Sequence, residues 1–264
     1  MKIKVNHEVP FSLLEDSQYF NDYEFILPHL LDLNSYYRDY MLEAKANGRY
    51  IVMDNSLHEL GEPYSEDRLM YWVEEIKPNE FVIPDHWEDS NLTIQEARKW
   101  SKVKLPAGVT KVVVAQGKKF TEIINCVEWF KNLGYGKIAF SYGASYYNDI
   151  CPHPNKSIGK ALGRLQAVSK LYKMEVIKPF DRVHLLGCAI PQEFSWYAGI
   201  TCIESLDTSN PIMATLDNIR YSDAGLLDKP KANMNTHSNI ERDKIDYELL
   251  DHNLEMFRKI NILM

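Results

Sequence analysis

Apolar runs that end on a polar residue recur along this chain. Four of them are YIVMD, FVIPD, KVVVAQ and CIESLD, which end at Asp54, Asp85, Gln116 and Asp207. The first three polar ends are 31 residues apart (85 − 54 and 116 − 85). That interval is about the length of one strand, one helix and the two loops that join them. The pattern therefore predicts repeated strand–helix units, each with a polar side chain at the C-terminal end of its strand.

Helical periodicity occupies the segments between these strands. In residues 65–76 an N-cap-type serine precedes acids in the first turn, and apolar residues follow at helical intervals. Residues 93–103 and 121–133 follow the same pattern, and Gly134 suits a helix C-cap. The polar, turn-rich segment 223–241 is predicted to be a mobile loop. Further helices are predicted over residues 157–175, 191–198 and 242–260.

The alternation of strands and helices predicts an α/β fold, a (β/α)8 barrel. Strands at residues 23–27, 137–140, 182–186 and 201–205 bring the count to seven, and residues 1–5 form an extra strand or a barrel plug. The barrel is therefore expected to be irregular or incomplete at its eighth unit. A chain of 264 residues matches the roughly 250 residues of such a barrel, so one domain over residues 1–264 is expected.

The composition bears on which partners the protein binds and where in the cell it lies. A net charge of −7 and a pI of about 5.7 give no global basic field for a polynucleotide, although a local basic patch stays open. No apolar run approaches the ~20 residues of a membrane helix, so a soluble, cytoplasmic protein is expected. Four cysteines without CxC or CxxC spacing predict reduced thiols and no metal site: Cys126, Cys151, Cys188 and Cys202.

Two of the strand-end aspartates have the chemistry of catalytic groups. Asp207 lies at a strand end in a turn of small residues, where a carboxylate can attack an electrophilic sugar carbon. A turn-capping aspartate accounts for the same residue. Asp54 opens a polar loop that can present a general acid/base, or it caps the following helix.

The other two strand ends suit recognition of a planar base. The Asp85 carboxylate can accept two N–H donors in one plane, as a guanine-like edge presents them, whereas three acids over residues 85–89 also fit a solvated helix start. Gln116 offers both a donor and an acceptor, and Gly117 lets the backbone approach a ligand. Because strand ends of a barrel meet on one face, these groups are expected around one purine-sized cavity.

In order and spacing, these motifs resemble the tRNA-guanine transglycosylase superfamily, and particularly its shorter, phage-type branch that inserts 7-deazaguanines into DNA. The resemblance covers residues from about 50 to 212. The family's zinc-binding extension has no counterpart after Asp207, and its basic tRNA-binding surface is poorly developed here. Both departures favour DNA, or a free nucleotide, over tRNA. If the resemblance to the phage branch extends to a phage origin, the protein is expected in the host cytoplasm. The matching segments are Asp54-Asn55-Ser56, Asp85, Gln116-Gly117, Ser141-Tyr142-Gly143, His184-Leu185-Leu186-Gly187 and Ser205-Leu206-Asp207.

The resemblance implies a base exchange that needs no cofactor. Asp207 would attack C1′ of a guanosine nucleotide, guanine would leave, and a 7-substituted 7-deazaguanine would take its place, with Asp54 as general acid/base. Asp85 and Gln116 would read the edges of the base. His58 and Leu186 would sandwich it, although the Leu57-His58 turn departs from the phage branch. The remaining residues implied to bind the substrate are Gly117, Ser141, Tyr142 and Gly187.

Two other functions stay open at this stage. One is a nucleosidase or transglycosylase that acts on free nucleotides, and the other is a non-catalytic barrel that binds a purine or a modified nucleotide. Whether the chain forms a homodimer is open too. Lysines and tyrosines near the predicted strand ends can bind phosphates and stack a flipped base, or be ordinary solvated lysines and core-rim tyrosines: Lys118, Lys119, Lys156, Lys160, Lys229, Lys231, Tyr142, Tyr146 and Tyr147.

Overall fold

The computed structural model describes residues 3–261, which contain eight strands. The strands form one sheet in the order β1-β8-β7-β6-β5-β4-β3-β2, with parallel pairing. Helices alternate with the strands along the chain, so the fold is α/β and of the (β/α)8 barrel class. The strands are β1 (Lys4–Asn6), β2 (Glu24–Ile26), β3 (Ile51–Met53), β4 (Glu80–Val82), β5 (Thr110–Val114), β6 (Lys137–Ser141), β7 (Arg182–Leu186) and β8 (Ile203–Asp207).

The N-terminal segment supplies the eighth strand. β1 pairs in parallel with β8, in a register that sets Asn6 opposite Asp207. Only Val5 in this three-residue strand is hydrophobic and buried, so its sequence carries almost no periodic signal. Residues 1 and 2 of the predicted segment lie outside the described residues.

The helices between the strands have the following bounds. The α-helices are α1 (Leu14–Ser17), α2 (Pro28–Leu33), α3 (Ser35–Ala46), α4 (Leu57–Leu60), α5 (Glu66–Ile76), α6 (Ser90–Trp100), α7 (Phe120–Asn132), α8 (Tyr146–Ile150), α9 (Lys156–Lys173), α10 (Asn210–Leu216), α11 (Met234–His237) and α12 (Tyr247–Ile260). The 3₁₀ helices are η1 (Phe11–Leu13), η2 (Pro191–Tyr197) and η3 (Arg242–Lys244).

Side-chain caps decide where several predicted helices begin. α6 begins at Ser90, ahead of the predicted Thr93, because the Asp89 side chain accepts a hydrogen bond from Leu92 N. The predicted helix 242–260 was wrong as one continuous element. Asp246 caps α12 and separates it from η3. The predicted loop 223–241 contains the short helix α11.

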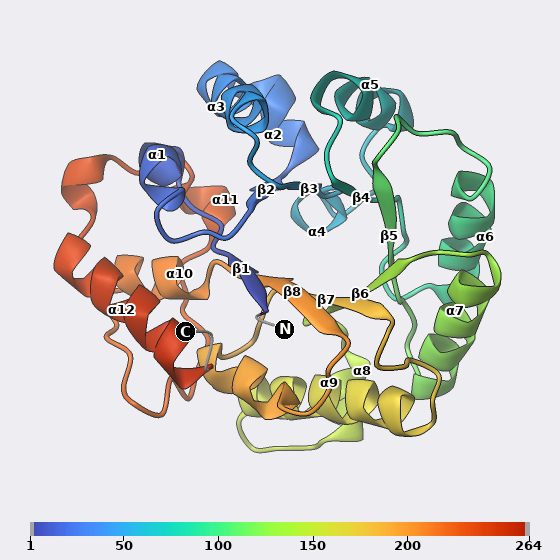
Figure 1. Ribbon diagram of the computed structural model, residues 1–264. Coiled ribbons are helices and arrows are strands. Elements are labelled where there is room, and N and C mark those ends of the chain that lie inside the picture. Colours follow the sequence, from blue (N-terminus) through green and yellow to red (C-terminus); the bar gives the residue numbers. More distant parts are fainter. Residues whose placement is uncertain (1–2, 262–264) are drawn as a thin grey trace. The chain divides into compact units, whose positions relative to one another are not determined.

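The described chain divides into two compact units. The first comprises residues 3–21, 141–180 and 185–261, and the second comprises residues 22–140 and 181–184. In the second unit, α5, α6 and α7 cover the outer side of the strands (Figure 1). Their amphipathic sequences bury one face each, as Leu69, Trp72 and Val73 of α5 do. A single domain over residues 1–264 stays a prediction.

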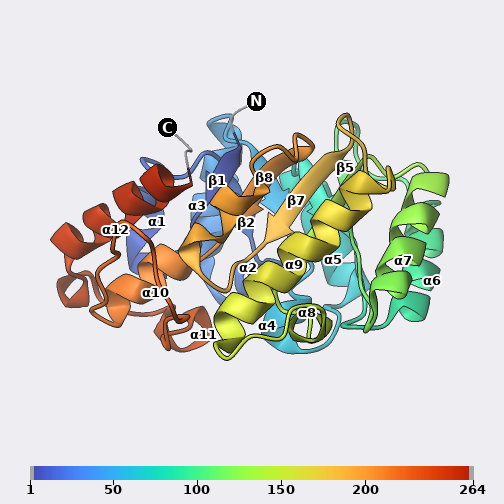
Figure 2. The same cartoon turned by 90° about the horizontal axis from the view of Figure 1, so that it is seen from below.

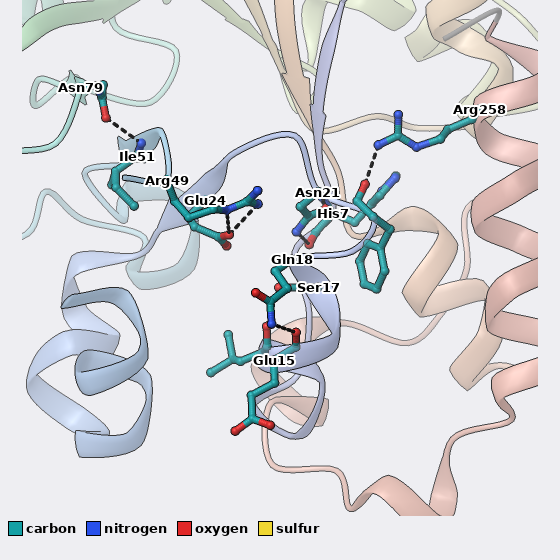
Figure 3. Close-up of polar contacts among 12 residues, drawn as sticks. His7, Glu15, Ser17, Gln18, Asn21, Glu24, Arg49, Ile51, Asn79 and Arg258 are labelled. Carbon is teal, nitrogen blue, oxygen red and sulfur yellow. Dashed lines mark hydrogen bonds and ion pairs between the residues drawn. The ribbon is translucent and has the colours of Figure 1, made fainter. Parts of the chain in front are cut away.

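In the second unit, buried charges gather where the strands begin. Glu80, at the start of β4, is fully buried and accepts hydrogen bonds from Lys137 Nζ at 2.6 Å and from Tyr50 Oη at 2.8 Å. The Arg182 guanidinium lies 2.5 Å from the same carboxylate. Glu24 of β2 pairs similarly with Arg49 (Figure 3). These contacts tie the beginnings of several strands together.

In the first unit, glycines let two helices touch. α8 lies beside the N-terminal end of α9 (Figure 2). A Cβ on Gly163 would lie 2.1 Å from the Tyr147 carbonyl oxygen, and one on Gly159 would lie 2.8 Å from Asn148 Oδ1. Because glycine has no side chain, these two positions allow α9 to approach α8 closely. α10 packs against α12 in the same unit, around Leu13, Ile212, Met213, Leu250 and Leu254.

Candidate functional site

A buried carboxylate held by two amides forms the centre of the candidate site in the second unit. Asp85 Oδ1 accepts a hydrogen bond from Asn55 Nδ2, and Asp85 Oδ2 accepts one from Gln116 Nε2, both at 2.6 Å. All three side chains are buried, with Asp85 only 3% exposed. Asp85 and Gln116 follow the ends of β4 and β5, so adjacent strand ends bring the two predicted base-reading residues into direct contact.

Burial makes the protonated form of Asp85 more stable, relative to the carboxylate, than it is in an exposed aspartate. Burial raises the pKa of this carboxyl to about 6, and the hydrogen bonds from Gln116 and Asn55 oppose the shift. Desolvation is the larger effect, because neither amide carries a charge that would stabilise the carboxylate. Asp85 therefore changes protonation state close to neutral pH.

Asn55 orders this network, and the sequence analysis did not assign it a role. Its Nδ2 donates to the Ile83 carbonyl at 2.9 Å as well as to Asp85, and its Oδ1 accepts from Leu57 N at 2.9 Å. Both N–H groups of the amide and one lone pair of its oxygen are thus engaged, which fixes its orientation. The available signal was its place beside Asp54 at a strand end.

Asp54 closes the turn that follows β3. Its Oδ2 accepts a hydrogen bond from Ser56 N at 2.9 Å, and its backbone N donates to the Ile26 carbonyl. Ser56 has a φ of 61°, a left-handed conformation that a serine adopts only when its surroundings hold it. Its hydroxyl lies 2.8 Å from His29 Nδ1. The carboxylate of Asp54 is buried to a similar degree as that of Asp207 and lies one residue from Asn55.

The backbone at Gly117 passes so close to α7 that there is no room for a side chain. A Cβ at this position would lie 2.7 Å from Glu122 Cβ, so the backbone after Gln116 runs directly against α7. Glu122 also accepts a hydrogen bond from Lys118 N at 2.7 Å. The loop after β5 is thereby fixed, which holds Gln116 toward Asp85.

His58 lies on α4 and is exposed. Its ring centroid is 5.8 Å from that of Trp87, with 40° between the ring planes. Trp87 follows Asp85 by two residues and is 40% exposed. The aromatic neighbour of His58 within the second unit is therefore a tryptophan that the sequence analysis did not single out.

In the first unit, Asp207 ends β8 beside Asn6 of β1. The two residues are partners in the parallel register, so their side chains project from the same face of the sheet. Both are buried. Thr208 follows, with its N donating to the Asn6 carbonyl at 3.0 Å and its Oγ1 accepting from Asn210 N at 3.1 Å. These bonds fix the turn after Asp207, and Asn6 is a neighbour that the sequence did not predict.

Tyr142, Leu186 and Gly187, which the resemblance implies as substrate-binding residues, contact one another in the first unit. Tyr142 N donates to the Leu186 carbonyl at 2.9 Å. A Cβ on Gly187, which has a φ of 60°, would lie 2.4 Å from Tyr142 Cδ1, so the tyrosine ring rests on this glycine. Ser141 Oγ accepts from Gly143 N at 3.2 Å. The Lys160 and Lys229 ammonium groups lie 5.9 and 4.5 Å from the centroid of the same ring.

Arg164 of α9 holds the end of β7. Its Nη1 and Nη2 donate to the Leu186 and Gly187 carbonyls at 2.9 and 2.8 Å, and its Nε pairs with Glu193 at 2.7 Å. Arg164 and Glu193 are both fully buried, and the Glu193 carboxylate keeps the pKa of Arg164 above its ordinary value. Sequence reasoning missed this residue, because an arginine within a helix gives no local sign of burial.

Tyr146 and Tyr147 do not present rings for stacking. Both are 2% exposed and their centroids are 4.5 Å apart, in the packing between α8 and α9. Of the two alternatives for these tyrosines, the structure supports packing in the core over stacking on a flipped base, because the close approach of α8 to the glycines of α9 buries both rings.

His7 is a buried histidine that the sequence analysis also missed. Its backbone exchanges hydrogen bonds with the Asn21 side chain, and its Nδ1 lies 3.3 Å from the Thr208 carbonyl. Arg258 lies near His7 (Figure 3), and burial, assisted by this arginine, lowers the pKa of His7 to about 3. His7 is therefore neutral at physiological pH, and its ring contacts the turn after Asp207 at the Thr208 carbonyl.

No protein-family model matches this chain, and no curated protein matches its sequence. The resemblance to the transglycosylases accordingly rests on the motifs quoted above. Within residues 3–261, no group of three or more His, Cys, Asp or Glu side chains is arranged to hold a metal ion. No helix in that range has the length and apolar character needed to traverse a bilayer. All four cysteines are free, as predicted.

Proposed function

We propose that the protein is a transglycosylase that exchanges guanine in a polynucleotide, DNA rather than tRNA, for a 7-substituted 7-deazaguanine. The observation that carries this proposal is the buried Asn55–Asp85–Gln116 network. A carboxylate has about four lone-pair positions, and the two amides occupy two of them. Asp85 can therefore still accept two N–H donors from guanine, whose N1–H and N2–H lie in one plane.

Gln116 complements this acceptor. Its Oε1 accepts from Glu88 N at 3.0 Å and its Nε2 donates to Asp85, which fixes the orientation of the amide. One N–H and one lone pair of the amide stay available for the base. Guanine and 7-deazaguanine share the edge that carries N1–H and N2–H, so one set of contacts serves both the leaving and the incoming base.

Asp207 is the nucleophile in this function. Its carboxylate forms a bond to C1′ as the C1′–N9 bond breaks, and the bonding electrons leave with guanine. The incoming base then attacks C1′ from the side that guanine left and displaces Asp207, which preserves the configuration at C1′. Asp54 donates the proton that guanine takes up and accepts the proton that the incoming base loses from N9.

Incorporation of labelled guanine or of 7-cyano-7-deazaguanine into DNA tests this function. We expect the wild-type protein to incorporate label and Asp207→Ala to abolish incorporation, because no covalent intermediate forms. Asp223→Ala is the matched control, since Asp223 is an exposed aspartate of the same unit that pairs with Lys259 at the surface. The control should keep wild-type activity.

Three outcomes contradict the proposal in different ways. Absence of exchange with any polynucleotide excludes a polynucleotide transglycosylase. Release of guanine from mononucleotides but not from DNA indicates an enzyme of free nucleotides. Stoichiometric purine binding without turnover, unchanged in Asp207→Asn, indicates a binding protein, because binding alone needs no nucleophile.

A further inference from the structure

Trp87 presents an aromatic surface to solvent from a rigid loop. Its side chain is 40% exposed, whereas Trp72 and Trp100 of the same unit are buried. The loop around it is fixed at several points: His86 N donates to Thr93 Oγ1 at 3.0 Å, and Asp89 N donates to the His86 carbonyl at 3.1 Å. A tryptophan held partly exposed on a hydrogen-bonded loop can offer its ring to a planar ligand.

The same loop is attached to the base-reading network. Glu88 has a φ of 53°, a left-handed conformation, and its N donates to Gln116 Oε1 at 3.0 Å. Gln116 in turn donates to Asp85. The position of Trp87 is thus set by the two side chains that read the base in the proposed function.

His58 enlarges this surface. It follows β3, the strand beside β4, and its exposed ring lies against that of Trp87 at 5.8 Å between centroids. Two aromatic side chains from neighbouring strand ends therefore form one exposed patch, next to Asp54 and Asp85 in sequence.

We propose that Trp87 and His58 form a second nucleobase subsite, which stacks the base that neighbours the exchanged one; this role replaces the sandwich around the exchanged base that the resemblance implied for His58. This inference rests on the proposed function and deepens it. The exchanged base must reach Asp85, which is buried, whereas the Trp87 ring faces solvent, so Trp87 meets a different base. Stacking on an aromatic ring accepts any base, because each one has a π-face.

The local charges fit a base better than a phosphate at the patch itself. Glu59, Glu62 and Glu88 lie close in sequence to the two rings and would repel a phosphate. A base is uncharged, so it is not repelled. Lys118 and Lys119 are exposed in the loop after Gly117 and can bind the adjoining phosphates. A mononucleotide has no neighbouring base, so the subsite favours a polynucleotide.

Binding of labelled oligonucleotides tests the subsite independently of catalysis. A fluorescein-labelled single strand with one guanine is titrated with wild-type protein, Trp87→Ala, Trp87→Phe and Tyr71→Ala by anisotropy. Trp87→Ala should weaken binding about tenfold, within the range of one lost base–aromatic stack. Trp87→Phe should keep most of the affinity. Tyr71 is the control, because it is 46% exposed on α5 and belongs to no part of the site.

An abasic nucleotide beside the guanine identifies the stacked base. The abasic nucleotide is placed either 5′ or 3′ of the guanine. If Trp87 stacks a neighbouring base, one of these two substrates should bind wild type as weakly as the intact oligonucleotide binds Trp87→Ala. The affinity of Trp87→Ala itself should be the same for that abasic substrate and for the intact oligonucleotide. Equal binding by Trp87→Ala and wild type, additive losses at both abasic positions, or no oligonucleotide binding by the wild type overturns the subsite.

The exchange assay separates this inference from the proposed function. If Trp87→Ala exchanges bases with an unchanged KM for the oligonucleotide, the result supports the transglycosylase function and contradicts the subsite. If oligonucleotide binding depends on Trp87 but no exchange occurs, the result contradicts the transglycosylase function and supports a nucleobase subsite. Equal melting temperatures of Trp87→Phe and wild type ensure that the comparison concerns folded protein.

Discussion

Asp85 shows how one side chain links stability to recognition. Burial of the carboxyl raises its pKa, and the hydrogen bonds from two amides lower it. The effect of burial is larger, so the pKa is raised to about 6. The sequence predicted that Asp85 and Gln116 would be neighbours, since polar strand ends at a constant interval share one face of a parallel sheet. It did not predict Asn55, because an asparagine in a polar loop has the same local pattern whether it is buried or solvated.

The raised pKa of Asp85 predicts a pH-dependent stability difference. A carboxyl whose folded pKa lies above its unfolded value stabilises the fold below the unfolded pKa of about 3.8, and this contribution is lost as pH rises through about 6. Wild type should therefore lose about 2–3 kcal/mol relative to Asp85→Asn between pH 4 and pH 7. Urea unfolding of both proteins at the two pH values measures this difference, and a constant difference would exclude a raised pKa.

At the scale of helices and strands, the sequence predicted elements that carry their own periodicity. α5 and α7 lie within one residue of prediction, because each buries a stripe of apolar side chains. α3 was not predicted, since the tyrosines and charges of its sequence (SYYRDYMLEAKA) give a weak amphipathic pattern. The first residue of α6 is set by the Asp89 side chain, which accepts a hydrogen bond from Leu92 N. Several polar residues in this segment could have capped the helix, so the sequence alone did not locate its start.

Gly163 is the residue on which the packing of α8 against α9 depends most directly. In a helix, Gly→Ala gains about 1 kcal/mol of intrinsic propensity. Here the added Cβ would lie 2.1 Å from the Tyr147 carbonyl oxygen, which is backbone and cannot rotate away. We expect Gly163→Ala to lower the free energy of unfolding by about 2 kcal/mol, typical of overpacking. The midpoint of urea unfolding measures this loss.

The control for this change is Gly136→Ala, because nothing lies within 4 Å of a Cβ at Gly136. Its stability should stay within about 0.5 kcal/mol of wild type, as for other substitutions away from packed sites. A destabilisation equal to that of Gly163→Ala would show that the α8–α9 contact is not the cause.

Across the whole molecule, each of the two compact units contains a buried ion pair. The first has Arg164 with Glu193, and the second has Glu80 with Lys137. The members of such pairs lie far apart in sequence: Arg182, which also contacts Glu80, is 102 positions further along the chain. Local sequence patterns contain no information about such pairs, since a lysine at a strand start is normally solvated. The fold class was predictable from periodicity, but the charges inside it were not.

Glu80 gives the sharpest test of these interior charges. Glu80→Gln would remove the Glu80 carboxylate from the buried Lys137 ammonium, which costs about 3–5 kcal/mol of stability. Because the broken ion pair causes the loss, Glu80→Gln combined with Lys137→Met should recover most of it, whereas independent effects would add. Glu66→Gln removes an exposed partner of Lys99 and should change stability by less than about 1 kcal/mol. A double-mutant cycle by urea unfolding measures the coupling, and additive losses would mean that Lys137 finds water or another partner once Glu80 is replaced.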